Sequence, residues 1–184
     1  MADKVGSFSD RSIIAFRDRM TGGGARSNLF EVNIELPSGV IDSSGEYKRD
    51  IRFMTKAAEI PASNIGNIPV PFRGRVLPVA GDRTFDPWTV TIINDVEFSS
   101  RSALEAWQTD IQELDSGEGI TSLDYLVDRA FVEQLNKDDT VLARYEFFNM
   151  FPTSIGAIDL SYETVDALET FDVEFQYSHW NRVV

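Results

Sequence analysis

Several short segments alternate apolar with polar residues, and this two-residue period constrains the fold more than any other feature of the chain. In LETFDVEFQYSHW, residues 168–180, every second residue of the central part is apolar: Phe171, Val173, Phe175 and Tyr177. NLFEVNIEL, residues 28–36, repeats the pattern, with Glu31 and Glu35 on its polar side. Successive side chains of a strand point to opposite faces, so both segments are predicted to be half-buried strands of antiparallel sheets.

Further strands are expected from segments of similar character. They are RDIRFMTKAAEI (49–60, broken near Ala57–Ala58), FDPWTVTIIN (85–94), LARYEFFNMF (142–151) and GAIDLSYETV (156–165). Loops are expected at FPTSIGAI, at DAL, and from Ile120 to Leu135, where a short helix is also compatible with the sequence. Residues 61–83 hold four of the seven prolines, which favours edge strands and extended loops over a central ladder.

One segment has helical rather than strand periodicity. In SSRSALEAWQTDIQELDSG, residues 99–117, the apolar residues recur at steps of three and four: Leu104, Trp107, Ile111 and Leu114. Ser102 and Glu105 form a possible capping box, and Gly117 is a plausible stop. This is the main helix that we expect.

The N-terminal segment differs from the rest of the chain. Ser9 or Asp10 could cap a short helix in which Ile13, Phe16, Arg17 and Met20 follow helical spacing. The following Gly22, Gly23 and Gly24 cost too much backbone entropy for a helix or strand interior, so they predict a flexible joint. We therefore expect an arm over residues 1–27 and a domain over 28–184. The fold class expected for that domain is mainly β (α+β): an antiparallel β-sandwich or barrel with one flanking α-helix.

The sequence offers little for catalysis or for a cofactor. It has no cysteine and a single histidine, His179, which excludes thiolate and histidine metal clusters. Asp82 and Asp86 flank Arg83 and could form an acid–base pair, but a turn at Gly81–Asp82 with local or inter-subunit pairing of these charges explains them better. We expect a non-enzymatic protein with no catalytic residue, metal, cofactor or small-molecule substrate.

The remaining features indicate self-assembly. The net charge is −13, which keeps a subunit soluble and repels nucleic acid in bulk. No apolar run is long enough to span a membrane, and the N-terminus lacks the apolar core of a signal peptide. Sheets with strand edges rich in proline, together with an N-terminal arm, are typical of a subunit that pairs with other chains.

Several quoted motifs resemble those of one family. VAGDRTFDPWTVTIIND (79–95), followed by a helix with Ala106–Trp107, is similar to the tail tube proteins of contractile-tailed, T4-like bacteriophages. FPTSIGAIDLSYE with ETFDVEFQY resembles their closing strands, and NLFEVNIE with KAAEIPASNIGNIPVPFRGR their opening strands and loop. The resemblance covers Asn28 to Trp180 and implies a fold shared with type VI secretion tube proteins.

The resemblance also implies a function. Hexameric rings would stack into a hollow tube inside a contractile sheath, and the tube would penetrate the host envelope and conduct the genome. The implied partners are further copies of the chain, the sheath protein, the baseplate and tail terminator proteins, and double-stranded DNA passing through without sequence-specific binding. The implied location is the virion tail, assembled in the host cytoplasm.

Three sets of residues follow from this interpretation. Acids on the polar faces of alternating strands are candidates for the lumen wall: Glu31, Glu35, Asp159, Glu163, Asp172 and Glu174. Asp82, Arg83 and Asp86 are candidates for pairing at a turn or between subunits, and Ile13, Phe16 and Gly22–Gly24 for an inter-ring arm. Two alternatives stay open: a tube of a type VI secretion system or phage-like bacteriocin, and a baseplate or terminator ring of related fold.

Overall fold

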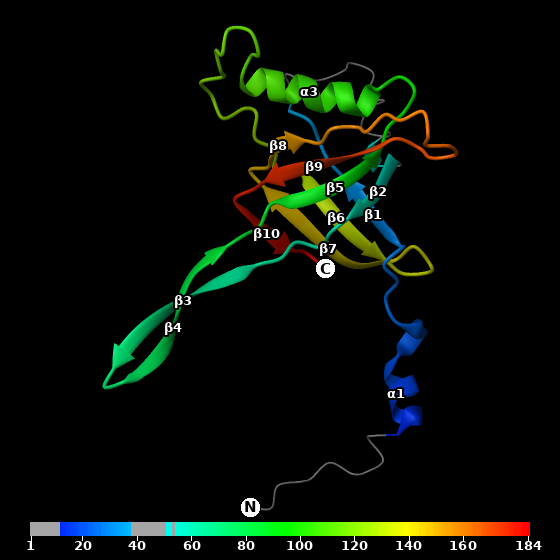
Figure 1. Cartoon of the computed structure of the whole chain (residues 1–184). Coiled ribbons are helices and arrows are strands. Elements are labelled where there is room, and N and C mark those ends of the chain that lie inside the picture. Colours follow the sequence, from blue (N-terminus) through cyan, green and yellow to red (C-terminus); the bar gives the residue numbers. More distant parts are fainter. Residues whose placement is uncertain (1–11, 38–50, 53) are drawn as a thin grey trace, which may run out of the picture.

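The computed structural model describes residues 12–37, 51–52 and 54–184, and it consists mainly of two antiparallel sheets (Figure 1). Sheet A has the order β1-β6-β7-β10, with bounds Phe30–Asn33, Ala130–Leu135, Val141–Phe148 and His179–Arg182. Sheet B has the order β2-β5-β9-β8, with bounds Thr55–Ala58, Trp88–Ile93, Thr170–Gln176 and Phe151–Ile155. The expected β-sandwich is confirmed.

The two sheets enclose the hydrophobic core. Burial alternates along β5 and along β9, and Val90 lies opposite Val173 in the register of the pair. The Trp88 and Phe147 rings stack across the two sheets with centroids 4.3 Å apart. The alternation seen in the sequence therefore assigns the inner face of sheet B correctly.

The main helix, α3 (Ser99–Ile111), packs on this core through Leu104 and Trp107, both fully buried. The expected capping box is wrong, because the helix begins at Ser99 and Ser102 lies inside it. Asp95 instead accepts hydrogen bonds from the Ser99 backbone N–H (3.3 Å) and hydroxyl (2.7 Å). The helix also ends before Leu114, whose side chain is 89% exposed.

Residues 64–84 form a long hairpin of two strands, β3 (Asn64–Phe72) and β4 (Arg75–Thr84), which projects beyond the sandwich (Figure 1). Arg73 and Gly74 form its tip with φ values of 47° and 78°, as a two-residue hairpin turn requires. The turn expected at Gly81–Asp82 is wrong, because both residues lie inside β4. The two strands approach closely here, because a Cβ added on Gly81 would lie 3.3 Å from the Gly66 backbone, and one added on Gly66 would lie 3.3 Å from the Asp82 carbonyl oxygen.

The N-terminal helix, α1 (Ile13–Arg19), has no buried residue and is followed by a 3₁₀ turn, η2 (Thr21–Gly23). Ser12 caps it by accepting a hydrogen bond from the Ala15 N–H at 3.1 Å. The expected caps Ser9 and Asp10 lie outside the described residues. None of the described helices is long and apolar enough to cross a membrane.

Three other expectations are corrected. Ile51, Arg52 and Met54 are helical instead of extended, and the Thr55 hydroxyl donates to the Ile51 carbonyl. Residues 130–135 form strand β6 where a loop was expected. Its alternation is obscured because Val132 and Glu133 are both buried.

The third correction exchanges a loop and a strand. FPTSI forms β8, and GAIDLSYETV forms no strand, although the sequence predicted the reverse. β8 keeps its place because Pro152 and Ile155 lie opposite the buried Phe175 and Val173 of β9. The segment after it has no neighbouring strand within the described chain with which to pair.

Candidate assembly surfaces

The β3–β4 hairpin carries the largest set of exposed apolar side chains. Every residue of β3 is exposed, and in β4 only Gly81 is partly covered. The large apolar side chains concerned are Ile65, Ile68, Val70, Phe72, Val76, Leu77 and Val79. An isolated two-stranded hairpin is at best marginally stable in water, and contiguous apolar surface marks an interaction site. The hairpin therefore has the properties of a docking element.

The base of the hairpin holds the charged residues singled out in the sequence. Asp86 accepts a hydrogen bond from the Asn64 side chain at 2.8 Å. Among the described residues, no ion pair joins Arg83 to Asp82 or Asp86, so the local pairing expected from the sequence is not formed. Arg83 lies opposite Ile65 in the ladder and is exposed. Its charge remains accessible to another subunit.

Tyr177 anchors this base to the core. Its ring lies 5.9 Å from Phe85 and 5.0 Å from Phe147. Burial raises the pKa of the Tyr177 hydroxyl, and the negative charge of Asp86 raises it further. The phenol therefore stays neutral at physiological pH, and the root of the hairpin is fixed by apolar packing.

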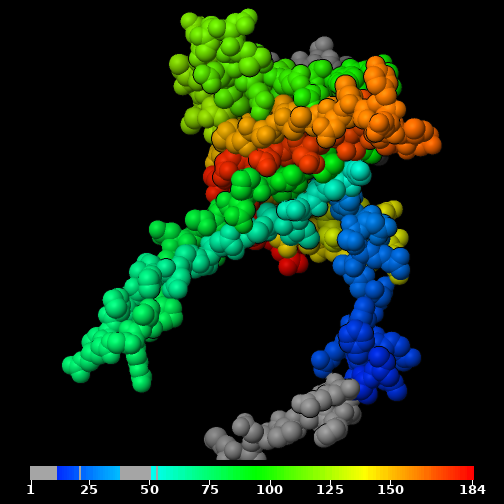
Figure 2. Space-filling model, in the orientation of Figure 1, coloured from blue at the N-terminus to red at the C-terminus, as the bar shows by residue number. Residues whose placement is uncertain are grey.

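Helix α1 presents a second apolar surface. Ile13, Ile14, Phe16 and Met20 are all exposed, and with Arg17 and Gly23 they line a shallow apolar hollow of about 470 Å³. Gly22, Gly23 and Gly24 follow with φ values of 72°, 83° and 78°. Non-glycine residues rarely adopt this left-handed backbone, so the joint requires glycine. In Figure 2 the hairpin and α1 extend from the body on the side away from α3.

The outer face of sheet A is a network of paired charges. Glu31 pairs with Arg52 at 2.7 Å, and Glu133 pairs with Arg144 across β6 and β7. Arg144 also lies 3.8 Å from Glu146 and covers the Phe131 ring at 4.4 Å. The sequence interpretation missed the network because Glu133 and Arg144 meet only through the strand register.

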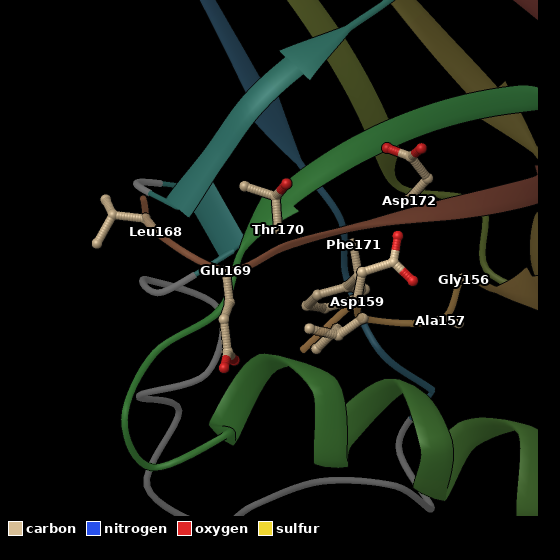
Figure 3. Close-up of a pocket in the computed structure, with 9 residues that line it drawn as sticks. Gly156, Ala157, Asp159, Leu168, Glu169, Thr170, Phe171 and Asp172 are labelled. Atoms are coloured by element: carbon tan, nitrogen blue, oxygen red, sulfur yellow. The ribbon is translucent and has the colours of Figure 1, made fainter. Parts of the chain in front are cut away.

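The outer face of sheet B has a different character. Asp172 accepts a hydrogen bond from the Thr91 hydroxyl at 2.6 Å, and Glu174 lies opposite Thr89. Strands β5 and β9 contain no lysine or arginine. Phe171 and Asp172 point to opposite sides of β9, with Phe171 on the side of α3 (Figure 3). Along β5 and β9 this face is therefore polar and acidic, and the one base of sheet B is the exposed Lys56 in β2.

The segment between β8 and β9, residues 156–169, closes one edge of sheet B. Gly156 donates its N–H to the Asp172 carbonyl at 2.7 Å, and the Arg101 guanidinium donates to the Gly156 carbonyl at 3.0 Å. A polar pocket of about 460 Å³ lies between residues 156–159 and 168–172 (Figure 3). The large side chains beyond it are exposed: Leu160, Tyr162, Val165 and Leu168.

The structure does not gather the six candidate acids on one face. Asp172 and Glu174 lie together on sheet B, whereas Glu31 is on sheet A and Glu35 follows β1. Asp159 and Glu163 lie in the segment between β8 and β9 and not in a strand. No group of three potential metal-ligating side chains is found among residues 12–37, 51–52 and 54–184.

Comparison with known proteins identifies the family of the chain. Residues 25–183 match the family described as "Phage tail tube protein". The chain is 33% identical to the tail tube protein gp19 of Enterobacteria phage T4 over 166 residues, 87% of this chain and 93% of the relative. It is 28% identical to the tail tube protein of Serratia phage KSP90 over 164 residues, covering 88% and 92%.

A solved structure shares the fold. A chain of the anti-feeding prophage baseplate, determined by cryo-EM, superposes with a TM-score of 0.60 at 10% identity, covering 87% of this chain and 95% of that one. The resemblance drawn from the sequence is thus confirmed by family, relatives and fold. The chain belongs to the phage tail tube protein family.

Proposed function

We propose that this chain forms hexameric rings that stack into a hollow tube inside a contractile sheath. The tube penetrates the host envelope and conducts double-stranded DNA. Its partners are other copies of the chain, the sheath, the baseplate and the tail terminator, and the subunits assemble in the host cytoplasm into the virion tail. Family membership supports this function, and no enzymatic step is required for it.

The β3–β4 hairpin is the observation that carries the proposal. Its apolar side chains project beyond the body, and no part of the subunit that the structure describes buries them. A ring stacked on the next would cover them. The arm with Ile13, Phe16 and Gly22–Gly24 extends on the same side and serves the same inter-ring contact, while Asp82, Arg83 and Asp86 pair across subunits.

The lumen wall is assigned here to the outer face of sheet B, with Asp172 and Glu174. Duplex DNA carries about one negative charge per 1.7 Å, and a basic wall would bind it. An acidic wall repels it over a Debye length, about 8 Å at physiological salt. Sheet A is less suited, because Glu31 and Glu133 are paired with arginines. In this proposal Glu31, Glu35, Asp159 and Glu163, which the sequence also suggested for the lumen, lie outside the lumen wall.

Electron microscopy of hairpin variants tests the function. Val70 and Leu77 are opposite each other in the hairpin, so Val70→Asp with Leu77→Asp places charges on one face. The unmodified chain should form hollow tubes of uniform width, alone or on purified baseplates, and the double variant should stop at single rings. Leu114→Asp, at an exposed apolar position just after α3, should leave the tubes intact.

Two results would contradict the proposal. Persistent monomers of the unmodified chain on baseplates would remove the tube function. Single rings that never stack would instead indicate a baseplate or terminator ring.

A further inference from the structure

The β3–β4 hairpin has one strongly apolar face. Residues that lie opposite each other in an antiparallel pair share a face, and so do alternate residues along each strand. Towards the tip, the register of β3 and β4 therefore places five large, exposed apolar side chains on the same face: Ile68, Val70, Phe72, Leu77 and Val79. We call these five residues the hairpin face.

The prolines of the hairpin weaken both of its outer edges for strand pairing. Pro69 and Pro78 lie opposite each other. Because neither has an N–H to donate, this pair is one in which the backbone nitrogens point away from the partner strand. The nitrogen of Pro71, two residues further along β3, lies on the same outer edge. A further strand would find fewer donors along these edges, so the hairpin is suited to packing through its face.

Stacking of identical rings requires a second surface on the same chain. When rings stack in one direction, the hairpin of each copy meets a different surface of the next copy. The segment between β8 and β9, residues 156–169, lies across the body from the hairpin (Figures 1 and 2). Its four large apolar side chains are at least 75% exposed: Leu160, Tyr162, Val165 and Leu168. The segment therefore offers apolar surface at the opposite end of the molecule.

The two surfaces carry opposite charge. Residues 64–84 contain a single acid, Asp82, and three arginines, and none of these arginines forms an ion pair within the described part of the chain: Arg73, Arg75 and Arg83. Residues 156–169 contain no base and four exposed acids: Asp159, Glu163, Asp166 and Glu169. Complementary charge favours contact between these two surfaces and disfavours contact between two hairpins.

The loop after α3, residues 112–124, is a weaker match for the hairpin. It is also acidic, but Glu113 and Asp124 already accept hydrogen bonds from serines of the same loop, at 2.6 and 2.7 Å. It has three exposed large apolar side chains, and that of Ile120 is only 42% exposed. This loop therefore supplies the matched controls.

We propose that the hairpin face packs on residues 156–169 of a copy in the next ring, with Arg73 and Arg75 against the acids of that segment. The inference rests on the proposed tube and adds which surface of the next ring receives the hairpin. Because the contact joins two different surfaces of the chain, it links copies along the tube and not around one ring.

Crosslinking tests the contact, because the chain has no cysteine of its own. In tubes of the double variant Val79→Cys with Ser161→Cys, grown alone or on purified baseplates, a short bis-maleimide should join copies in successive rings. The covalent oligomers should continue beyond the size of one ring. The control Val79→Cys with Ser116→Cys, which uses an exposed serine of the loop after α3, should give no ladder. Each single variant should give no ladder either.

Exchange of charge gives a second measurement that does not depend on the crosslink. Arg73→Glu with Arg75→Glu should raise the subunit concentration needed for tubes at least about tenfold, equivalent to about 1.4 kcal/mol per contact. Adding Asp159→Lys with Glu163→Lys should restore tube formation. Adding Glu113→Lys with Asp115→Lys makes the same charge change on the loop after α3 and should not restore it. All six positions are exposed, so circular dichroism should show an unaltered fold.

The outcomes separate this inference from the proposed function. Tubes that form normally without a Val79–Ser161 crosslink, or with an equal Val79–Ser116 crosslink, overturn the docking and leave the tube standing. A ladder that ends at the size of one ring also overturns it, because the contact would then lie within a ring. Restoration by both pairs of lysines, or by neither, overturns it as well. If the unmodified chain forms no tubes, even on baseplates, both fall.

Discussion

Gly156 shows how a single residue can hold the edge of a sheet. An added Cβ would lie 2.9 Å from the Asp172 carbonyl oxygen, a distance that real Cβ atoms do not adopt, so the backbone would have to shift. We expect Gly156→Ala to lower the free energy of unfolding by about 1–3 kcal/mol, in the range of overpacking substitutions. Urea unfolding of the dispersed subunit measures it. Ala157→Ser, at the next and exposed position, should change it by less than about 0.5 kcal/mol, and equal effects would contradict the close approach.

Asp95 gives a pH-dependent contribution to the start of α3. Burial raises the pKa of its carboxyl, but hydrogen bonds from the Ser99 hydroxyl and backbone lower it by more, so the net pKa lies below the usual value. Because the pKa is lower in the folded state, the ionised carboxylate stabilises the fold, and this stabilisation is fully present above the unfolded-state pKa of about 3.9. The stabilisation is lost as the pH falls through the folded-state pKa.

Asp95→Ala should therefore cost about 1 kcal/mol at pH 7, as loss of a helix cap does. The difference from the unmodified chain should shrink when unfolding is measured below the usual carboxyl pKa. Glu97→Ala, an exposed acid in the same turn, is the control and should change stability by less than about 0.5 kcal/mol. A loss for Asp95→Ala that stays constant down to low pH would exclude the ionised cap.

At the scale of elements, the sequence placed Trp107 and Leu114 on one face of the main helix, but the structure buries Trp107 and leaves Leu114 exposed after the end of α3. The Trp107 ring lies 6.3 Å from Phe175, and its indole N–H donates to the Tyr125 carbonyl at 2.9 Å. Trp107→Ala should lower the free energy of unfolding by about 3–5 kcal/mol, because it leaves a cavity and an unpaired carbonyl. Leu114→Ala should lower it by less than about 0.5 kcal/mol. Comparable losses in urea unfolding would place Leu114 in the core.

The sequence predicted best those helices and strands that bury one face, because their apolar residues then recur with the period of the element. β5, β9 and the central turns of α3 each pack one side on the core, so period and burial agree. β6 was missed because the apolar Phe131 stands between the buried Ala130 and Val132, so the sequence shows no alternation; on the outer face Arg144 covers the Phe131 ring.

Other elements could not be recovered from local pattern. The sequence predicted a loop at β8 and a strand in the segment after it. Alternation of apolar and polar residues indicates that a segment can form a strand, but it does not show whether a neighbouring strand is present to pair with it. The projection of the hairpin was not predicted, since residues 61–83 read as edge strands whether or not they pack on the body. The dispersal of the candidate acids over two sheets follows from strand order, which no local pattern contains.

At the scale of the whole molecule, the surfaces divide by role. The apolar hairpin and α1 extend away from the body. On the outer face of sheet A, Glu31 and Glu133 are paired with arginines, whereas the outer face of sheet B has no base in β5 or β9. In the tube proposed above, the apolar parts would be buried between copies and the acidic face would stay exposed. If that face lines the lumen as proposed, its negative charge would repel the phosphates of duplex DNA.

Reversal of charge on that face tests the lumen assignment. Glu174→Lys should leave tubes of normal width but make them retain duplex DNA, because each subunit then adds a cation next to the phosphates. In co-sedimentation at low salt, we expect DNA binding to rise at least about tenfold and to fall steeply as salt increases. Asp110→Lys makes the same charge change on α3 and should not raise it. If both variants bind DNA equally, the contact is on the outside of the tube and sheet B does not line the lumen. If neither binds although tubes form, Glu174 is remote from the DNA path.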